Sequence, residues 1–248
     1  MQIVVWALVL ALLVSASGPV RSAAPQGEAT LRWFGHAFVL ITSPEGVRVA
    51  MDPFGEIGYP MPDVEADVVT ISHGHGDHSN APLVKGKPEV LQGLTPDGRD
   101  WARVNFRRRD VTITSFRAYH DKAQGKQRGL NTLFLVEVGG LRIAHLSDIG
   151  HVPAEEALRA LGRVDILLVP VGGVYSIDGA EATQLADRLK AAITIPIHYK
   201  TEATASWPIA DELAFLEGKP RVRRVGNSVR ISRELLPRNP EVWVMDYR

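Results

Sequence analysis

Residues 73–78 read His-Gly-His-Gly-Asp-His, which places three imidazoles and one carboxylate within six consecutive positions. No ordinary demand of folding calls for such a cluster. Imidazole nitrogen and carboxylate oxygen are ligands that zinc and similar divalent ions prefer. We expect the two glycines to let a tight loop turn successive side chains toward one point. The segment therefore predicts part of a metal site, and more specifically part of a site for two ions.

A His-rich surface loop that binds metal only adventitiously is the alternative interpretation. The sequence just before the cluster argues against it, because residues 66–72 form an apolar run typical of a buried strand. Ligands at the end of a core strand are held in place. The position of the cluster thus favours a built metal site.

Three further candidate ligands follow strand-like runs elsewhere in the chain. His120 ends the run that starts at residue 111, Asp148 follows residues 141–147, and His198 follows residues 193–197. Folds with open sheets place their ligand sites where strands end. Each residue alone would more often cap an element or fill the core. Together with residues 73–78 they predict a complete metal centre.

Composition excludes several classes of protein. The chain has no cysteine, so it has neither disulfides nor thiolate ligands, and His, Asp and Glu remain as the metal-binding residues. It carries 28 basic and 28 acidic residues, whereas general polyanion binders have a strong basic excess. The run at 107–109 is a solvated face or, alternatively, an anion-steering patch. We expect a small-molecule substrate and no nucleic-acid partner.

The first residues have the order of a secretory signal peptide. An apolar stretch at 3–14 is followed by Ser, Gly, Pro and small residues up to position 24. A bilayer-spanning helix needs ~20 apolar residues, more than this stretch has. We expect residues 1–24 to be a signal peptide and residues 25–248 one domain. The mature protein would be periplasmic or secreted, with no stable membrane association; an uncleaved anchor or a misplaced start codon is the alternative.

Strand patterns come first and then alternate with helical patterns. The expected strands are at residues 31–41, 47–51, 67–72, 111–118, 132–138, 141–146, 166–171 and 192–197. The expected helices are at residues 154–161, 180–191 and 209–216. This order predicts a layered α/β fold in which helices cover mixed sheets.

The chain resembles the metallo-β-lactamase superfamily through essentially its whole mature length. The superfamily's pattern, His-X-His-X-Asp-His followed by a His, an Asp and a His after later strands, is matched in order by His73, His75, Asp77, His78, His120, Asp148 and His198. Segments 33–37, 51–54, 171–178 and 195–201 resemble the metal-dependent hydrolase branch that includes ascorbate-6-phosphate lactonase-like proteins. The resemblance implies an αββα sandwich of two mixed β-sheets flanked by helices, with both metals at one edge.

The resemblance also implies how the ligands divide between two divalent ions. One ion would be held by His73, His75 and His120, the other by Asp77, His78 and His198, and Asp148 would bridge them. Zinc is the first expectation, with manganese or iron possible for such ligands.

A metallo-hydrolase mechanism follows from two such ions. A hydroxide bridging them would attack an ester, lactone, amide or phosphodiester bond. Asp77 is the expected catalytic residue, since its free oxygen could orient the hydroxide or accept a proton.

Other residues are candidates for contacts with ligands or substrate. Asp52 could accept a hydrogen bond from a ligating imidazole, or it could simply form an Asp-Pro turn. His36 is expected to line the site, His151 could reach the pocket, and His145 is expected to be structural. The candidates for contact with an anionic substrate are Lys122, Lys126, Arg128, Tyr199 and Lys200. Each of them can also be explained as a solvated loop charge or a structural residue.

Two other functional classes remain open. The first is an iron-dependent redox enzyme on the same fold, similar to sulfur dioxygenases; the sequence lacks an appended flavin domain and a glutathione-site signature. The second is a metal-binding protein without catalysis, which the complete ligand set disfavours. The sequence does not define the oligomeric state.

Overall fold

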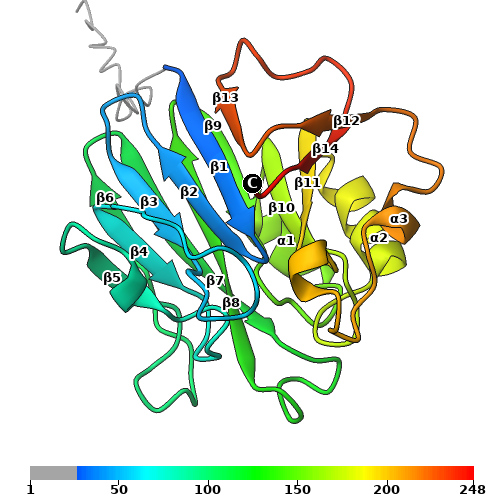
Figure 1. Cartoon of the computed structure of the whole chain (residues 1–248), viewed down its shortest axis with the longest axis horizontal. Coiled ribbons are helices and arrows are strands. Elements are labelled where there is room, and N and C mark those ends of the chain that lie inside the picture. The colour runs from blue at the N-terminus through cyan, green and yellow to red at the C-terminus, as the bar shows by residue number, and fades with distance from the viewer. Residues whose placement is uncertain (1–26) are drawn as a thin grey trace, which may run out of the picture.

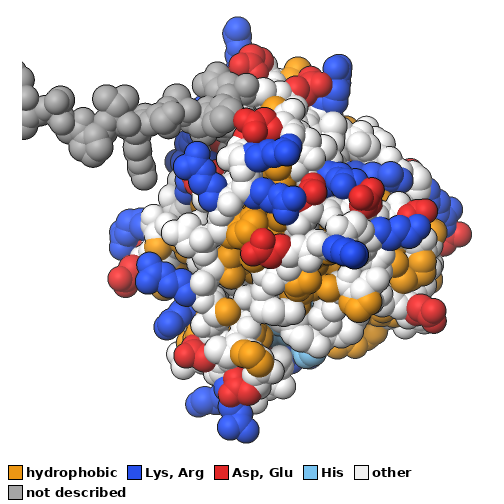
Figure 2. Space-filling view, turned by 90° about the vertical axis from the view of Figure 1, so that its left-hand side faces the viewer, with side chains coloured by type: hydrophobic (Ala, Val, Ile, Leu, Met, Phe, Trp, Pro, Cys, Tyr) orange, Lys and Arg blue, Asp and Glu red, His pale blue; other side chains and the backbone are white. Residues whose placement is uncertain are grey.

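The computed structural model describes residues 27–248 as two β-sheets packed face to face, with helices beside one of them (Figure 1). The expected signal peptide at residues 1–24 lies outside the described residues. Basic and acidic side chains are interspersed on the face shown in Figure 2, as the equal numbers of the two charges lead us to expect. No helix within residues 27–248 is both long and apolar enough to cross a bilayer.

The first sheet has six strands. Their spatial order is β13 (Ser228–Ile231), β1 (Ala29–Gly35), β2 (Phe38–Thr42), β3 (Arg48–Met51), β4 (Val68–Ile71) and β5 (Glu89–Gln92). Neighbours from β13 to β3 are antiparallel, whereas β3, β4 and β5 are parallel. The sheet is therefore mixed.

The second sheet has eight strands. Their spatial order is β12 (Val222–Val225), β14 (Glu241–Met245), β11 (Ile193–Ile197), β10 (Ile166–Pro170), β9 (Leu141–His145), β8 (Leu130–Val138), β7 (Val111–Tyr119) and β6 (Asn105–Arg108). Neighbours from β12 to β9 are parallel, and those from β9 to β6 are antiparallel. Gly139 and Gly140 form the tight turn between β8 and β9, both with positive φ.

The α-helices lie on the side of the eight-stranded sheet (Figure 1). They are α1 (Glu155–Leu161), α2 (Gly179–Leu189) and α3 (Leu213–Leu216), and two short 3₁₀ turns are η1 (Ala81–Leu83) and η2 (Glu202–Thr204). Helix α2 begins with a capping box, in which Asp178 accepts from the Glu181 amide at 2.9 Å. Its residues Ala182 and Leu185 are fully buried, so its apolar face packs inward as the sequence pattern predicts.

The core has two parts, because the central strands of the first sheet are buried on both faces. One cluster lies between the sheets and joins residues such as Leu31 and Met51 to Phe134 and Ile143 of the second sheet. The other packs Phe34, Phe38 and Ala50 against loop residues on the outer face, including Phe54, Tyr59 and Val84. Burying such side chains contributes about 1.5–3 kcal/mol each. Loops and η1, rather than long helices, thus cover the outer face of the six-stranded sheet.

The predicted fold class is confirmed, with one strand pattern corrected. The apolar run at 31–41 is not one strand but the hairpin β1–β2, which turns at His36 and Ala37. His36 adopts a left-handed backbone with φ 52°, and the pairing register shifts between Trp33 and Gly35. The turn was hidden because residues on both sides of it are apolar and buried.

Strand ends bring the candidate ligands together. Four non-glycine residues that follow strands at the ligand cluster have positive φ, a conformation seen in only a few per cent of such residues. They are His36 (52°), Asp52 (47°), Ser147 (50°) and His198 (49°), after β1, β3, β9 and β11. Each costs about 1–3 kcal/mol of strain. The fold therefore tolerates local strain at the edge where these side chains meet.

Candidate metal centre

Three imidazoles from two segments converge on one point. His75 Nδ1 lies 3.1 Å from His73 Nε2 and 3.2 Å from His120 Nε2. Tetrahedral zinc with Zn–N bonds of 2.0–2.1 Å sets ligand nitrogens roughly 3.3 Å apart. The spacing of these nitrogens is thus close to that of ligands on a shared ion. This is the first of the ligand groups that the resemblance implied.

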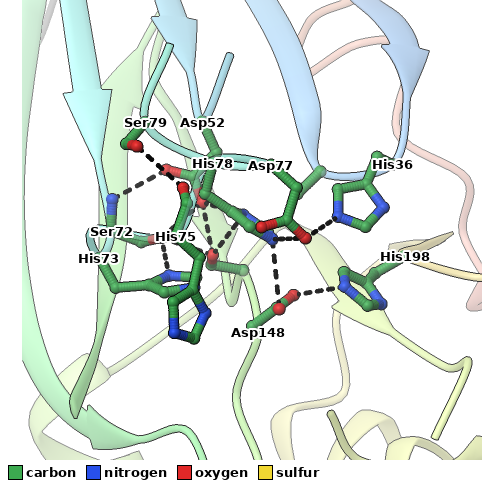
Figure 3. Close-up of polar contacts among 12 residues, drawn as sticks. His36, Asp52, Ser72, His73, His75, Asp77, His78, Ser79, Asp148 and His198 are labelled. Carbon is green, nitrogen blue, oxygen red and sulfur yellow. Dashed lines mark hydrogen bonds and ion pairs between the residues drawn. The ribbon is translucent and has the colours of Figure 1, made fainter. Parts of the chain in front are cut away.

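The second group of candidate ligands lies beside the first, and it includes one residue that the resemblance did not imply as a ligand (Figure 3). Asp77, His78 and His198 offer ligand atoms within 4.8 Å of one another, and His36 belongs to the same cluster. His36 Nε2 lies 3.1 Å from Asp77 Oδ2, and its ring packs at a tilt against the His198 ring, with centroids 4.0 Å apart. His36 therefore lies within the ligand cluster and contacts Asp77 directly, but it is fully buried and does not line the cavity.

Asp148 lies between the two groups. Its Oδ2 is 3.2 Å from His78 Nε2 and 3.4 Å from His120 Nε2. Its Oδ1 is 2.9 Å from His198 Nε2. One carboxylate thus reaches ligands of both groups, which is the position that a bridging ligand requires.

Buried atoms without hydrogen bonds show that the pocket suits cations. Among residues 27–248, His78 Nε2, His198 Nε2 and Asp148 Oδ1 are buried and make no hydrogen bond. The 2.9 Å contact between Asp148 and His198 lacks hydrogen-bond geometry. Leaving such a group unsatisfied costs about 1–3 kcal/mol. Divalent ions accepting these lone pairs would remove that cost, so the residues fit a metal centre.

Asp52 contacts candidate ligands of both groups, directly or through Ser72, without being a candidate ligand itself. Its carboxylate accepts from the Ser72 amide at 2.8 Å and the Ser72 hydroxyl at 2.6 Å, and it lies 3.1 Å from His78 Nδ1. The Ser147 hydroxyl also donates to it. Ser72 Oγ in turn lies 2.9 Å from His73 Nδ1. Asp52 therefore contacts the imidazole of His78, a candidate ligand, and through Ser72 it also reaches His73 of the other group.

Burial and charge set the protonation of these groups in the metal-free site. Burial would raise the pKa of Asp52, but the hydrogen bond from His78 and the neighbouring imidazoles lower it to about 2. Burial and the charge of His78 hold the pKa of His73 well below its usual range. Burial would lower the pKa of His78 too, but Asp148 and Asp52 hold it well above its usual range. His73 thus offers a free lone pair, whereas a metal at His78 must displace a proton.

The glycines of the His-rich loop do not have the role we expected. Neither Gly74 nor Gly76 has positive φ, and a Cβ on either would meet nothing within 4 Å. Two other glycines carry the steric constraint. A Cβ on Gly150 would lie 2.3 Å from the His120 carbonyl, and one on Gly172 would lie 2.3 Å from the His198 carbonyl oxygen. Close backbone packing, rather than loop flexibility, positions these ligands.

A cavity of about 450 Å³ opens onto both ligand groups. Its lining consists of His75, Asp77, His120, Gln127, Arg128, Asp148, Tyr175, Ser206, Trp207 and Pro208. Trp207 packs edge-on against His36 at 5.4 Å and against Tyr175 at 6.3 Å, measured between ring centroids. Sequence reasoning missed Trp207, although a tryptophan in a loop soon after His198 was a usable signal.

Comparison with known proteins gives the family. A family model described as "Beta-lactamase superfamily domain" matches residues 30–198. The chain belongs to the beta-lactamase superfamily. A UPF0173 metal-dependent hydrolase of Carboxydothermus hydrogenoformans is 31% identical over 224 residues, 80% of this chain and 95% of that protein. A UPF0173 protein of Pyrococcus abyssi is 32% identical over 183 residues, 68% of this chain and 82% of that protein.

A solved structure agrees with this family. A Thermotoga maritima protein described as a Zn-dependent hydrolase of the metallo-beta-lactamase superfamily is 33% identical, with a TM-score of 0.69. The match covers 88% of this chain and 98% of that one. The superfamily and the enzyme class predicted from sequence are thus confirmed: the chain is a metal-dependent hydrolase of the beta-lactamase superfamily.

The other predicted histidines of this superfamily member lie behind the cavity. His151 Nε2 accepts from the Tyr119 amide at 3.1 Å, so it braces the residue before His120 and is not part of the cavity lining. His145 is fully buried and contacts the Ala37 carbonyl at 2.9 Å, a structural role as expected.

The candidate substrate contacts divide clearly. Arg128 lines the cavity, whereas Lys126, Tyr199 and Lys200 do not. Lys122 forms an ion pair with Glu181 at 2.7 Å, and Tyr199 is buried against Trp33. Arg108 and Arg109 of the basic run contact Asp67 and the Glu45 carbonyl, and neither belongs to the cavity lining.

Proposed function

We propose that this chain is an exported hydrolase that holds two zinc ions and uses a hydroxide bridging them to cleave an ester, lactone, amide or phosphodiester bond. When bound, such ions supply this nucleophile near neutral pH, because coordination lowers the pKa of water from about 15.7 to about 7. The observation that carries the proposal is the position of Asp148, which lines the cavity: its Oδ2 approaches His120 of one group and His78 of the other, and its Oδ1 approaches His198.

Zinc is the metal that the donor set supports best. The candidate ligands are imidazoles and carboxylates, and the chain has no cysteine. Zinc accepts such ligands readily, although manganese and iron bind them as well. The description of the Thermotoga maritima relative as Zn-dependent points the same way.

Asp77 is placed to orient the nucleophile. It lines the cavity, while its Oδ2 accepts a hydrogen bond from His36 at 3.1 Å. Burial would raise the pKa of Asp77, but this hydrogen bond and the charge of His78 hold it well below its usual range. Burial also lowers the pKa of His36 to about 3, so His36 remains neutral and donates through Nε2. An ionised, oriented Asp77 suits a group that accepts a hydrogen bond from the nucleophile.

Export and the substrate's size complete the proposal. The apolar start of the chain supports a signal peptide at residues 1–24 and a periplasmic or secreted enzyme. A cavity of about 450 Å³ suits a small molecule better than a nucleic acid. Fractionation of the native cells, with determination of the mature amino terminus, tests the export proposal.

A hydrolysis panel tests the activity. Metal-loaded protein would be assayed with an aryl ester, a lactone, an amide and a phosphodiester, alongside His75→Ala and Lys126→Ala variants. His75 is exposed, so its loss removes a candidate ligand without opening the core. We expect turnover of at least one bond class, a loss of about a hundredfold or more in His75→Ala, and no change in Lys126→Ala. Absence of turnover on every class, or an unaffected His75→Ala, would contradict the proposal. Iron with oxygen consumption would favour redox chemistry instead.

A further inference from the structure

The cavity carries one charged residue that is not a candidate ligand. Arg128 lines it, and the guanidinium carbon lies 5.5 Å from the centroid of the Tyr175 ring. Within residues 27–248 the Arg128 side chain has no carboxylate at ion-pair distance, whereas Lys122 of the same loop is paired with Glu181 at 2.7 Å. Stacking on an aromatic face leaves the N–H edges of a guanidinium available. The cavity therefore presents an unneutralised cation.

The loop that carries Arg128 is fixed next to the metal centre. Asp121, the neighbour of His120, accepts backbone N–H bonds from Ala123 at 2.7 Å and Gly125 at 3.0 Å through Oδ1. Its Oδ2 accepts from Gln127 at 3.0 Å and from Arg128 itself at 2.7 Å. One buried carboxylate thus organises the whole loop 121–128. The base of the Arg128 side chain is held at a set distance from His120 rather than on a free loop.

An apolar surface joins this cation to the ligands. Trp207 lies edge-on to Tyr175 on one side and to His36 on the other, and both Trp207 and Tyr175 are half-buried. The wall of the cavity thus runs from Arg128 over Tyr175 to Trp207. Trp207 packs against the buried His36, which contacts Asp77, and Asp77 itself lines the cavity. A molecule lying along this wall would meet a cation at one end and the candidate metal ligands at the other.

We infer that this wall is the substrate subsite, and that the substrate carries a carboxylate or phosphate group, bound by Arg128, attached to an apolar or planar body that packs on Tyr175 and Trp207. The inference rests on the proposed hydrolase function and narrows its substrates to anions. A guanidinium binds carboxylate and phosphate through two parallel N–H bonds, which a neutral group of the same shape does not match.

Binding of a matched pair of probes tests the inference without requiring turnover. Phenylacetate and its neutral isostere phenylacetamide would be titrated into metal-loaded protein by calorimetry. We expect wild-type protein to bind the anion more tightly. Arg128→Gln should weaken phenylacetate binding about tenfold, the worth of a charge-assisted hydrogen bond, and leave phenylacetamide unchanged. Lys126→Gln removes the same charge from the same loop outside the cavity and should change neither probe. Trp207→Leu should weaken both probes several-fold.

The outcomes separate the subsite from the activity. An anion preference that survives in Arg128→Gln would show that the carboxylate binds the metal alone and would overturn the inference. Equal losses for both probes in Arg128→Gln would mean that Arg128 merely supports Tyr175, and absence of binding by either probe would also overturn it. Phenylphosphonate, tested the same way, tells whether phosphate-like anions share the subsite. Arg128-dependent binding without hydrolysis of any bond class would instead count against the proposed function alone.

Discussion

Asp52 Oδ2 lies 3.1 Å from His78 Nδ1, and both side chains are completely buried. A hydrogen bond from Nδ1–H to this carboxylate leaves His78 Nε2 as the ring atom that faces Asp148, 3.2 Å away. The same carboxylate accepts from Ser72, whose hydroxyl contacts His73. One buried acid therefore sets ring orientation in both ligand groups.

Replacing Asp52 should weaken metal binding without removing any ligand. We expect Asp52→Asn to lower metal affinity about 10- to 100-fold, because the amide no longer fixes the ring tautomer of His78. Competition with a chromophoric chelator measures this affinity. Asp67→Asn is the matched control, since Asp67 is half-buried and contacts Arg48 rather than a candidate ligand. Equal affinities in Asp52→Asn and wild type would refute this role.

Gly150 and Gly76 should respond in opposite ways to an added methyl group. In Gly150→Ala the new Cβ would overlap the His120 carbonyl at 2.3 Å, so the His120 backbone must move. We expect a clear loss of metal affinity and about 1–3 kcal/mol of stability. Gly76→Ala meets nothing within 4 Å and should be close to neutral. The same chelator assay measures the metal affinity of both variants, and urea unfolding measures their stability. A Gly150→Ala variant with unchanged affinity and stability would disprove the steric account.

The metal-free protein should lose stability in acid partly through His36. Burial, followed by the charge of His198, lowers the pKa of His36 from 6.5 to about 3. Between these values the unfolded chain binds a proton at this ring that the folded chain does not. The contribution of His36 to the free energy of unfolding is therefore complete above pH 6.5. It declines by about 1.4 kcal/mol per pH unit as the pH falls toward 3.

A variant isolates this proton. His36→Asn removes the titrating ring and keeps a residue that tolerates the left-handed backbone at this position. Urea unfolding of the metal-free wild type and the metal-free variant at pH 5.5 and 4.5 gives the pH dependence of the free energy of unfolding for each protein. We expect the pH dependence of the free energy of unfolding to be smaller in the variant by about one proton. Parallel pH profiles would count against a neutral, buried His36.

Helix α2 offers a test of the fold that leaves the site alone. Lys190 ends the helix in a left-handed conformation, with φ 50°. Glycine adopts this conformation without the Cβ penalty, so Lys190→Gly should stabilise the protein by about 0.5–1 kcal/mol. Lys190→Ala, which keeps the Cβ, should give no such gain. Thermal unfolding compares the two, and a destabilised glycine variant would contradict the assignment of this helix end.

The candidate ligands that the structure brings together could be found in the sequence because each is a chemically distinctive residue at or near the end of an apolar run. Buried strands such as β4, β10 and β11 appear as continuous apolar segments. The strands that escaped prediction include β5, β6 and β12, which are exposed and largely polar. Such edge strands gain their structure from pairing with a neighbour, and that pairing leaves little local signal.

The surroundings of the ligands were less predictable. Ser72 and Ser147 join Asp52 only because β4 and β9 end at the same edge, and their separation of 75 residues hides this contact. Gly150 and Gly172 were overlooked because their constraint comes from the backbone of distant ligands. Trp207 likewise reaches the cavity through a loop whose path depends on the complete fold. Contacts of this kind follow from tertiary structure rather than from any local pattern.

Metal stoichiometry tests the central claim most directly. Metal-replete wild-type protein, His120→Ala and His198→Ala would be analysed by elemental mass spectrometry, because each variant lacks a candidate ligand from one group only. We predict two zinc ions per wild-type chain and one per chain in each variant. A wild-type chain that retains a single ion or none, or two variants that both retain two ions, would contradict a dinuclear centre bridged by Asp148.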